Sequence, residues 1–300
     1  MATLMTEGLA AISELTMSYL NAGPFAVLFA LTVIAAIVDV PITLYKTVYG
    51  DTVGYGFSIC FQTLVIRWAF PPESGGVADA LTWVVIVWAL RLAFYLLFRD
   101  LMGWSRATNV ETLTKRFTVA VGLSNYYAFV IIPVLYALRF PNTNSAYDKY
   151  LWAGVYMAWA GTILETVADV HKWLVKFNAK DLNKFEGPSD GVYRLSRHPN
   201  YAGELMVWLG VWIAAFPSFT FSITAVAVST LGFIMLNGIL LFEASIRVER
   251  EQKRKYSGQV RYEQWKQKVP LSVLPFAPLL AAELPGLLRF PFIISAAASK

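Results

Sequence analysis

The chain has few of the residues from which soluble metal and redox sites are built. Among its 300 residues there is one cysteine, there are two histidines, and only 15% are charged, whereas soluble domains carry about 25% charged residues. A lone Cys60 excludes an intramolecular disulfide and a cysteine-rich metal site. His171 and His198 have no third ligand at a recognisable spacing, so we expect no bound metal. A glycine-rich phosphate loop after a strand is also missing, which argues against a soluble dinucleotide-binding fold.

The first 23 residues contain no lysine or arginine, but they do contain Glu7 and Glu14. The positive n-region of a signal peptide is therefore missing, and we expect residues 1–23 to be retained as an N-terminal segment. No Gly/Ser-rich linker and no internal repeat divides the rest of the chain. We therefore expect a single membrane domain at 24–276, followed by a tail at 277–300.

Long apolar runs are the main feature of the sequence. The chain is 57% hydrophobic with a mean hydropathy of +0.51, and one bilayer crossing needs roughly 20 apolar residues. Such runs form helices, because backbone polar groups in lipid must bond to one another. The pattern predicts an all-α, multi-pass membrane protein with about seven spans. These are expected at Pro24–Tyr45, Gly56–Phe70, Ala78–Phe98, Thr118–Leu138, Tyr150–Leu174, Tyr201–Ala215 and Phe219–Phe242.

Positive charge gathers towards the C-terminus. The segment Arg247–Lys268 holds eight Lys or Arg and three Glu, a net charge of +5 that equals the charge of the whole chain. A basic segment beside a span indicates the cytoplasmic side. The loop Lys172–Arg197 also carries cations and lies two predicted spans away, so both segments are expected on one face. Either they set the topology and bind anionic lipid headgroups, or they meet over a pocket that attracts an anionic dinucleotide.

The densest polar cluster is Ser196–Glu204, where a polar loop leads into an apolar span. These nine residues combine a cation, a histidine, an amide, a phenol and a carboxylate, in the order Arg197, His198, Asn200, Tyr201 and Glu204. Such a cluster is costly at a membrane boundary unless something polar or charged binds there. It is therefore the first candidate binding site.

Charged residues inside the predicted spans give a second signal. Each would be expensive in lipid, so each should face the bundle interior or a hydrated cavity. Their spacing of three or four residues places them on two helical faces. One stripe is Trp88, Arg91, Tyr95 and Arg99, and the other is Glu165, Asp169 and Lys172. The alternative is a set of buried ion pairs that hold helices together, for instance Arg91 with Glu165.

Taken together, these segments resemble the domain of unknown function 1295 family, over about Asp39 to Phe276. That family is part of the steroid 5α-reductase and isoprenylcysteine methyltransferase superfamily, whose members use NADPH or S-adenosylmethionine. The resemblance implies a membrane-embedded oxidoreductase of lipid metabolism, which reduces a carbon–carbon double bond of a lipid or sterol-like enone with NADPH. The segments that carry it are Trp88–Arg99, Ile163–Lys172, Asp190–Glu204, Tyr262–Trp265 and Val269–Phe276.

The resemblance also implies roles for single residues. In the reductases an acidic residue on an early span pairs with a catalytic tyrosine to polarise the substrate carbonyl, and Asp39 is the candidate for that acid. The implied catalytic set is Asp39, Trp88 and Tyr95. The implied cofactor-binding set is Arg91, Glu165, Asp169, Arg197, His198, Asn200, Tyr201, Glu204, Arg247 and Glu251.

Trp88 is a departure from the reductases, because they have the catalytic tyrosine at this position. An indole N–H donates a hydrogen bond but is not a general acid, whereas enone reduction also requires delivery of a proton. Tyr95, Tyr193 or a water held by Asp39 are the candidate substitutes.

Two other functions remain open. Methyl transfer needs no general acid, and Arg247-x-x-x-Glu251 is similar to the methyltransferase branch, so an S-adenosylmethionine-dependent isoprenylcysteine or lipid methyltransferase is one alternative. A non-catalytic membrane subunit or lipid-binding protein is the other. The expected partners are membrane lipid and a hydrophobic substrate, with no nucleic acid. The resemblance places the protein in the endoplasmic reticulum if the host is eukaryotic, with the basic segment in the cytoplasm.

Overall fold

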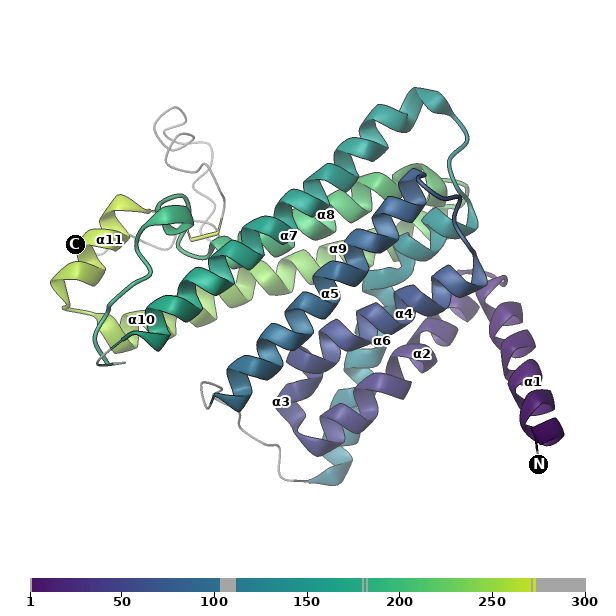
Figure 1. Ribbon diagram of the computed structural model, residues 1–300, viewed down its shortest axis with the longest axis horizontal. Helices are drawn as coiled ribbons and strands as arrows, with labels where there is room; N and C mark the ends of the chain where they lie inside the picture. Colours follow the sequence, from purple (N-terminus) through teal and green to yellow (C-terminus); the bar gives the residue numbers. More distant parts are fainter. Residues whose placement is uncertain (1, 103–111, 180, 182, 271, 274–300) are drawn as a thin grey trace. The chain divides into compact units, whose positions relative to one another are not determined.

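The computed structural model describes residues 2–102, 112–179, 181, 183–270, 272 and 273 (Figure 1). Helix is the only regular secondary structure in this described part, so the predicted all-α class is confirmed. The chain divides into two compact units. Unit 1 comprises Met1–Val155 and Val211–Phe233, and unit 2 comprises Tyr156–Gly210 and Ile234–Lys300. The single membrane domain at 24–276 stays a prediction, and the predicted tail at 277–300 lies outside the described residues.

Unit 1 is built on the packing of α2 against α6 and α4, with α4 also packed on α5 and α1 on α2 (Figure 1). A π-helix, η1, lies between α3 and α4 and packs on α2 and α5. The elements are α1 (Ala2–Leu20), α2 (Pro24–Tyr45), α3 (Thr47–Tyr49), η1 (Gly50–Gly54), α4 (Tyr55–Ala69), α5 (Val77–Leu101), α6 (Leu113–Arg139) and the 3₁₀ turn η2 (Ser145–Tyr147).

Unit 2 contains most of α7, the first half of α8, the second half of α9 and everything that follows α9. A second π-helix, η4, continues α9 directly into α10. The elements are α7 (Asp148–Phe177), the 3₁₀ turn η3 (Gly191–Arg194), α8 (Pro199–Phe219), α9 (Ile223–Phe242), η4 (Glu243–Val248), α10 (Glu249–Tyr256) and α11 (Val260–Lys268).

The apolar helices satisfy many of their own polar side chains internally. The hydroxyls of Thr63, Ser124 and Thr162 each donate to the backbone carbonyl four residues earlier, at 2.7, 2.8 and 2.9 Å. This bond removes an unmet donor from an apolar environment without a partner helix. Pro24 and Pro199 begin α2 and α8, at the position where a missing N–H costs nothing.

Each predicted span lies largely on a helix, although Phe219–Phe242 begins at the end of α8 and includes the turn before α9. The count of seven spans is not confirmed. Within the described residues, five helical stretches are long and apolar enough to cross a membrane. They are Pro24–Tyr45, Val77–Leu101, Leu113–Arg139, Pro199–Phe219 and Ile223–Tyr256. These spans indicate an integral, multi-pass membrane protein.

The two predicted spans that do not qualify fail for different reasons. Helix α4 has 15 residues, or about 22 Å at 1.5 Å per residue, which is shorter than a hydrocarbon core of roughly 30 Å. Helix α7 has 30 residues and is long enough. It is less apolar, because Glu165, Asp169 and Lys172 all lie in its second half.

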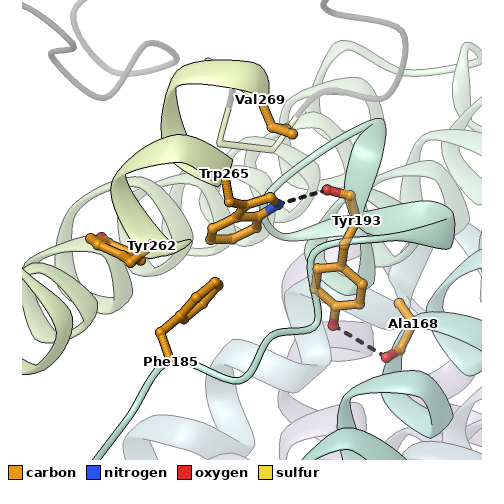
Figure 2. Packing of buried hydrophobic residues seen from close by; sticks show 6 residues of the cluster. All are labelled: Ala168, Phe185, Tyr193, Tyr262, Trp265 and Val269. Carbon is orange, nitrogen blue, oxygen red and sulfur yellow. Dashed lines mark hydrogen bonds between the residues drawn. The ribbon is translucent and has the colours of Figure 1, made fainter. Parts of the chain in front are cut away.

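An aromatic cluster in unit 2 holds the loop that precedes α8 against α11 (Figure 2). The Phe185 ring stacks on Trp265 with centroids 5.1 Å apart. The Tyr193 hydroxyl donates to the Ala168 carbonyl at 3.2 Å, and the Trp265 indole N–H donates to the Tyr193 carbonyl at 3.1 Å (Figure 2). Helix α7, the loop and α11 are therefore joined immediately before the Ser196–Glu204 motif begins.

Candidate functional site

A buried ionic cluster lies at the start of α8 in unit 2. Glu249 Oε1 accepts a hydrogen bond from Arg197 Nε at 2.8 Å and lies 2.8 Å from His198 Nε2. Arg197 and His198 are each 2% exposed, and Glu249 is 6% exposed. Charges removed from water in this way are stable only when they are paired and hydrogen-bonded. The contact also joins the loop Lys172–Arg197 to the segment Arg247–Lys268, whereas the pocket expected between them stays a prediction.

The same cluster holds the chain beyond α11. Arg197 Nη1 donates to the Val269 carbonyl, and the backbone N–H of His198 donates to the Ser272 carbonyl at 2.8 Å. The Ser196 hydroxyl donates to that same carbonyl at 2.9 Å. These contacts anchor Arg197 and His198 to Glu249 and to the chain beyond α11, while the buried Nη2 of Arg197 has no hydrogen-bond partner among the described residues. Direct cofactor contact by either one stays a prediction.

Helices α7 and α8 cross at two glycines in unit 2. A Cβ on Gly161 would lie 2.5 Å from the carbonyl oxygen of Gly203, and a Cβ on Gly203 would lie 2.7 Å from the backbone nitrogen of Glu165. The backbones are therefore in direct contact, as is typical of small residues where membrane helices cross. Glu204 follows Gly203 directly, so the crossing fixes the backbone positions of both Glu165 and Glu204.

Three carboxylates of the predicted cofactor set are buried in this unit. Glu165 is 2% exposed, Asp169 is 4% exposed, and Glu204 is 8% exposed. Glu165 and Asp169 are four residues apart and share a face of α7, as the sequence predicts. A concentration of buried carboxylates is unusual, because such residues are almost never fully buried unless they are paired.

Asn200 is the second residue of α8. Its Oδ1 atom is buried and has no hydrogen-bond partner among the described residues. The Tyr201 ring lies edge-on to His198, with centroids 6.0 Å apart. A buried amide oxygen without a donor is costly, so Asn200 stays a candidate ligand-binding residue.

Arg247 and Glu251 lie on the continuous helix that follows α9. Arg247 is exposed and pairs with Glu243 on the preceding turn and with Glu251 on the next, the latter at 3.1 Å. Exposed pairs of this kind contribute little to stability. A role of Arg247 and Glu251 at a cofactor stays a prediction.

The predicted catalytic residues all belong to unit 1. Asp39 on α2 is fully buried, and its Oδ1 occupies the space that a Cβ on Gly54 would need, 2.3 Å from that position. Neither carboxylate oxygen has a hydrogen bond of good geometry among the described residues. Trp88 is also fully buried and lies edge-on to Tyr55, with centroids 5.5 Å apart. Asp39 and Trp88 therefore flank the junction of η1 and α4.

Arg91 and Tyr95 are half-buried on α5, one and two turns beyond Trp88. They belong to unit 1, whereas Asp169, Asn200 and Glu204 belong to unit 2. The cavity that these five residues are expected to share, and the alternative pairing of Arg91 with Glu165, both stay predictions.

Tyr127 was missed by sequence reasoning. It is 1% exposed, and its hydroxyl donates to the Gly50 carbonyl of η1 at 2.7 Å. Its ring stacks on Tyr55 with centroids 5.3 Å apart. No sequence signal distinguishes Tyr127 from the other tyrosines of α6, because its partner is 77 residues away.

Burial also changes the proton affinity of groups outside the spans. Burial lowers the pKa of His198, although the hydrogen bond to Glu249 opposes the shift. The imidazole is therefore neutral near pH 7, with Nε2 donating to the carboxylate. Burial raises the pKa of Tyr262 on α11 to about 12, so this phenol stays protonated.

These features define a helical, multi-pass membrane protein with a buried polar cluster at the start of α8. The chain belongs to the family described as Protein of unknown function (DUF1295), which matches residues 51–269. That match includes the two buried carboxylates of α7 and the whole Ser196–Glu204 motif. No curated protein and no solved structure matches the chain significantly.

Proposed function

We propose that the protein is a membrane-embedded reductase that uses NADPH to reduce the carbon–carbon double bond of a lipid or sterol-like enone. The observation that supports this most is the buried Oδ1 of Asn200, which lacks a donor among the described residues. It lies in the same unit as the buried carboxylates of Asp169 and Glu204. A buried amide oxygen without a donor suits a ligand that carries hydroxyl or amide donors, and NADPH offers both.

The polar residues of unit 2 fit NADPH in two respects. Asn200, Glu204, Glu165 and Asp169 would accept from its ribose hydroxyls and carboxamide, and the cations of Arg247–Lys268 would attract its phosphates. When bound, NADPH supplies the hydride that adds to the β-carbon of the enone. The cytoplasmic placement of this face, and the endoplasmic reticulum in a eukaryotic host, are parts of the same proposal.

The chain itself must polarise the substrate carbonyl and deliver a proton to the α-carbon. Trp88 donates through its indole N–H but cannot supply the proton. Asp39 and Tyr95 are the proposed proton-handling residues. Trp88→Tyr would add a hydroxyl to that helical face, and we expect it to keep NADPH binding and raise enone turnover. Loss of native activity with no gain in enone reduction would make Trp88 a packing residue instead.

The deciding experiment is a titration of the purified protein in lipid nanodiscs with NADPH and, separately, with S-adenosylmethionine. We expect saturable NADPH binding and no S-adenosylmethionine binding. Asn200→Ala should weaken NADPH binding by about 1–3 kcal/mol, the cost of leaving a buried partner unpaired, with a smaller change in thermal stability. The matched control is Asn142→Ala, on an exposed loop of unit 1, which should leave affinity unchanged. If Asn200→Ala lowers stability while affinity is kept, Asn200 is not part of a cofactor site.

A methyltransferase is the second candidate. The observation that favours it is the ion pair of Arg247 with Glu251 at 3.1 Å, within the sequence pattern that is similar to that branch. Saturable S-adenosylmethionine binding without NADPH binding would establish this function. Binding of neither cofactor would favour a non-catalytic membrane subunit or lipid-binding protein.

A further inference from the structure

Glu249 lies outside the Ser196–Glu204 motif but makes two side-chain contacts to it. One carboxylate oxygen, Oε1, lies 2.8 Å from both Arg197 Nε and His198 Nε2, which are 52 and 51 residues away along the chain. The residues that flank Glu249 differ from it, because Arg250 is exposed and Val248 is half-buried. The carboxylate is therefore directed specifically at the two residues that precede α8.

The π-helix η4 explains why Glu249 points inwards. Ala244 in η4 is 0% exposed and Glu249 is 6% exposed, and they are five residues apart. In an α-helix, residues five apart point about 140° away from each other. A π-helical turn closes i→i+5 hydrogen bonds and so brings such residues towards one face; turns of this kind are frequent at functional sites. The extra residue in η4 thus places a carboxylate where an undistorted helix would turn it away.

The first turn of α8 depends on the two residues that Glu249 holds. The His198 carbonyl accepts from the Ala202 N–H at 3.1 Å, so His198 is the residue from which α8 starts. Pro199 follows with a fixed φ, and Asn200 comes next. The proline ring fixes one torsion between His198 and Asn200, and the hydrogen bond from Ala202 to the His198 carbonyl closes the first turn. A displaced His198 would therefore shift the backbone of Asn200, and its side chain with it.

We propose that Glu249 is a positioning residue, which fixes Arg197 and His198 and thereby aims Asn200 Oδ1 at a hydroxyl or amide donor of the bound ligand. The identity of that ligand as NADPH rests on the proposed function. The positioning itself rests on the contacts within unit 2. Glu249 does not need to touch the ligand, because it acts through the imidazole and the guanidinium.

The test is Glu249→Gln in full-length protein in nanodiscs, compared with Glu263→Gln on α11. Glu263 is half-buried, and its side chain accepts a long hydrogen bond of 3.4 Å from the Gly258 N–H. We expect Glu249→Gln to raise the Kd for NADPH about 10-fold to 100-fold, the range for losing a charged hydrogen bond. The KM for NADPH should rise with it, while kcat at saturating NADPH stays within about twofold. The Glu263→Gln variant should match the wild type in both.

Amide hydrogen exchange at residues 200–202 separates positioning from general destabilisation. Positioning predicts faster exchange at the start of α8 in Glu249→Gln, with exchange in α4 and α5 unchanged. An unchanged Kd, or a loss of affinity accompanied by faster exchange throughout the protein, would overturn the proposal. If Glu249→Gln does not fold, Glu249→Asp keeps the charge at a shorter reach and should give the same local pattern with a smaller rise in Kd.

The exchange measurement also distinguishes this proposal from the proposed function. If the wild type binds no NADPH, the proposed function fails, and local exchange at 200–202 still decides whether Glu249 positions α8. If the wild type binds NADPH and Glu249→Gln leaves both affinity and local exchange unchanged, the positioning proposal alone fails.

Discussion

Both units bury carboxylates beside glycines, but the glycines act differently in the two units. In unit 1, Gly54 makes room for a side chain, because the Oδ1 of Asp39 occupies the place of its missing Cβ. In unit 2, Gly161 and Gly203 bring two backbones together. A side chain can rotate away from an added methyl group, whereas two packed helices must separate. The crossing in unit 2 should therefore tolerate substitution less well.

The units also differ in how their buried carboxylates are compensated. In unit 2, Glu249 has a guanidinium and an imidazole within 2.8 Å. In unit 1, Asp39 has no ion pair among the described residues. A paired buried charge is costly to disturb, whereas replacing a carboxyl that lacks a cation costs little. The Glu249 cluster therefore stabilises unit 2, whereas the Asp39 carboxyl is expected to contribute little to the stability of unit 1.

The largest effect is expected where the ionic cluster is broken. Arg197→Ala leaves Glu249 buried without its guanidinium, so the free energy of unfolding should fall by about 3–5 kcal/mol. Asp39→Asn in unit 1 should change it by less than about 1 kcal/mol. Denaturant unfolding in detergent measures both, with exposed Arg250→Ala as the control. Equal effects of Arg197→Ala and Asp39→Asn would remove the distinction between the units.

The second effect concerns the backbone crossing. A methyl group on Gly161 would meet the backbone at 2.5 and 2.7 Å, at Gly203 O and Val207 N. We expect Gly161→Ala to lower the free energy of unfolding by up to about 3 kcal/mol, as overpacking does. Gly238→Ala is the matched control in α9, because nothing lies within 4 Å of its added Cβ. That control should stabilise by about 0.5–1 kcal/mol, since alanine favours helix more than glycine does.

The third largest effect is expected at the contact between Gly54 and the Asp39 side chain in unit 1. Gly54→Ala should cost about 1 kcal/mol, because the Asp39 carboxyl can move and the Tyr49 carbonyl is already 3.0 Å away. Adding Asp39→Ala to Gly54→Ala should restore part of the loss, as a double-mutant cycle would measure. No recovery in the double variant would mean that the backbone, and not Asp39, limits the space.

The smallest effect is a pH dependence that belongs to unit 2. Burial lowers the pKa of His198 in the folded protein, so the unfolded state binds the proton more readily as the pH falls through about 6.5. Stability is therefore full above that pH and decreases below it. Between pH 7.5 and 6.0 the loss should be below about 1 kcal/mol. His198→Gln should flatten this slope, as denaturant unfolding of the two proteins at pH 7.5 and 6.0 would measure.

Much of the fold could be predicted because its signals are local. The bounds predicted for the first span, Pro24–Tyr45, coincide with α2, since a proline start and an uninterrupted apolar run specify both its beginning and its class. The burial of Asp39, Glu165 and Asp169 follows from the cost of charge in lipid. The count of seven spans is not confirmed, because the short α4 and the more polar α7 are not among the five candidate spans that length and composition give in the described residues.

The sequence by itself determined the class of protein, the family and the junction at Ser196–Glu204, because composition and spacing along one helix are properties of neighbouring residues. The tertiary structure alone decided which groups far apart along the chain are paired with one another. Glu249 reaches Arg197 across 52 residues through a π-helical turn, and Tyr127 reaches Gly50 across 77. No local pattern encodes such pairs, since they join residues that are far apart along the chain. The close crossing of α7 and α8 at Gly161 and Gly203 is likewise a contact between separate helices, and it leaves no periodic trace in the sequence.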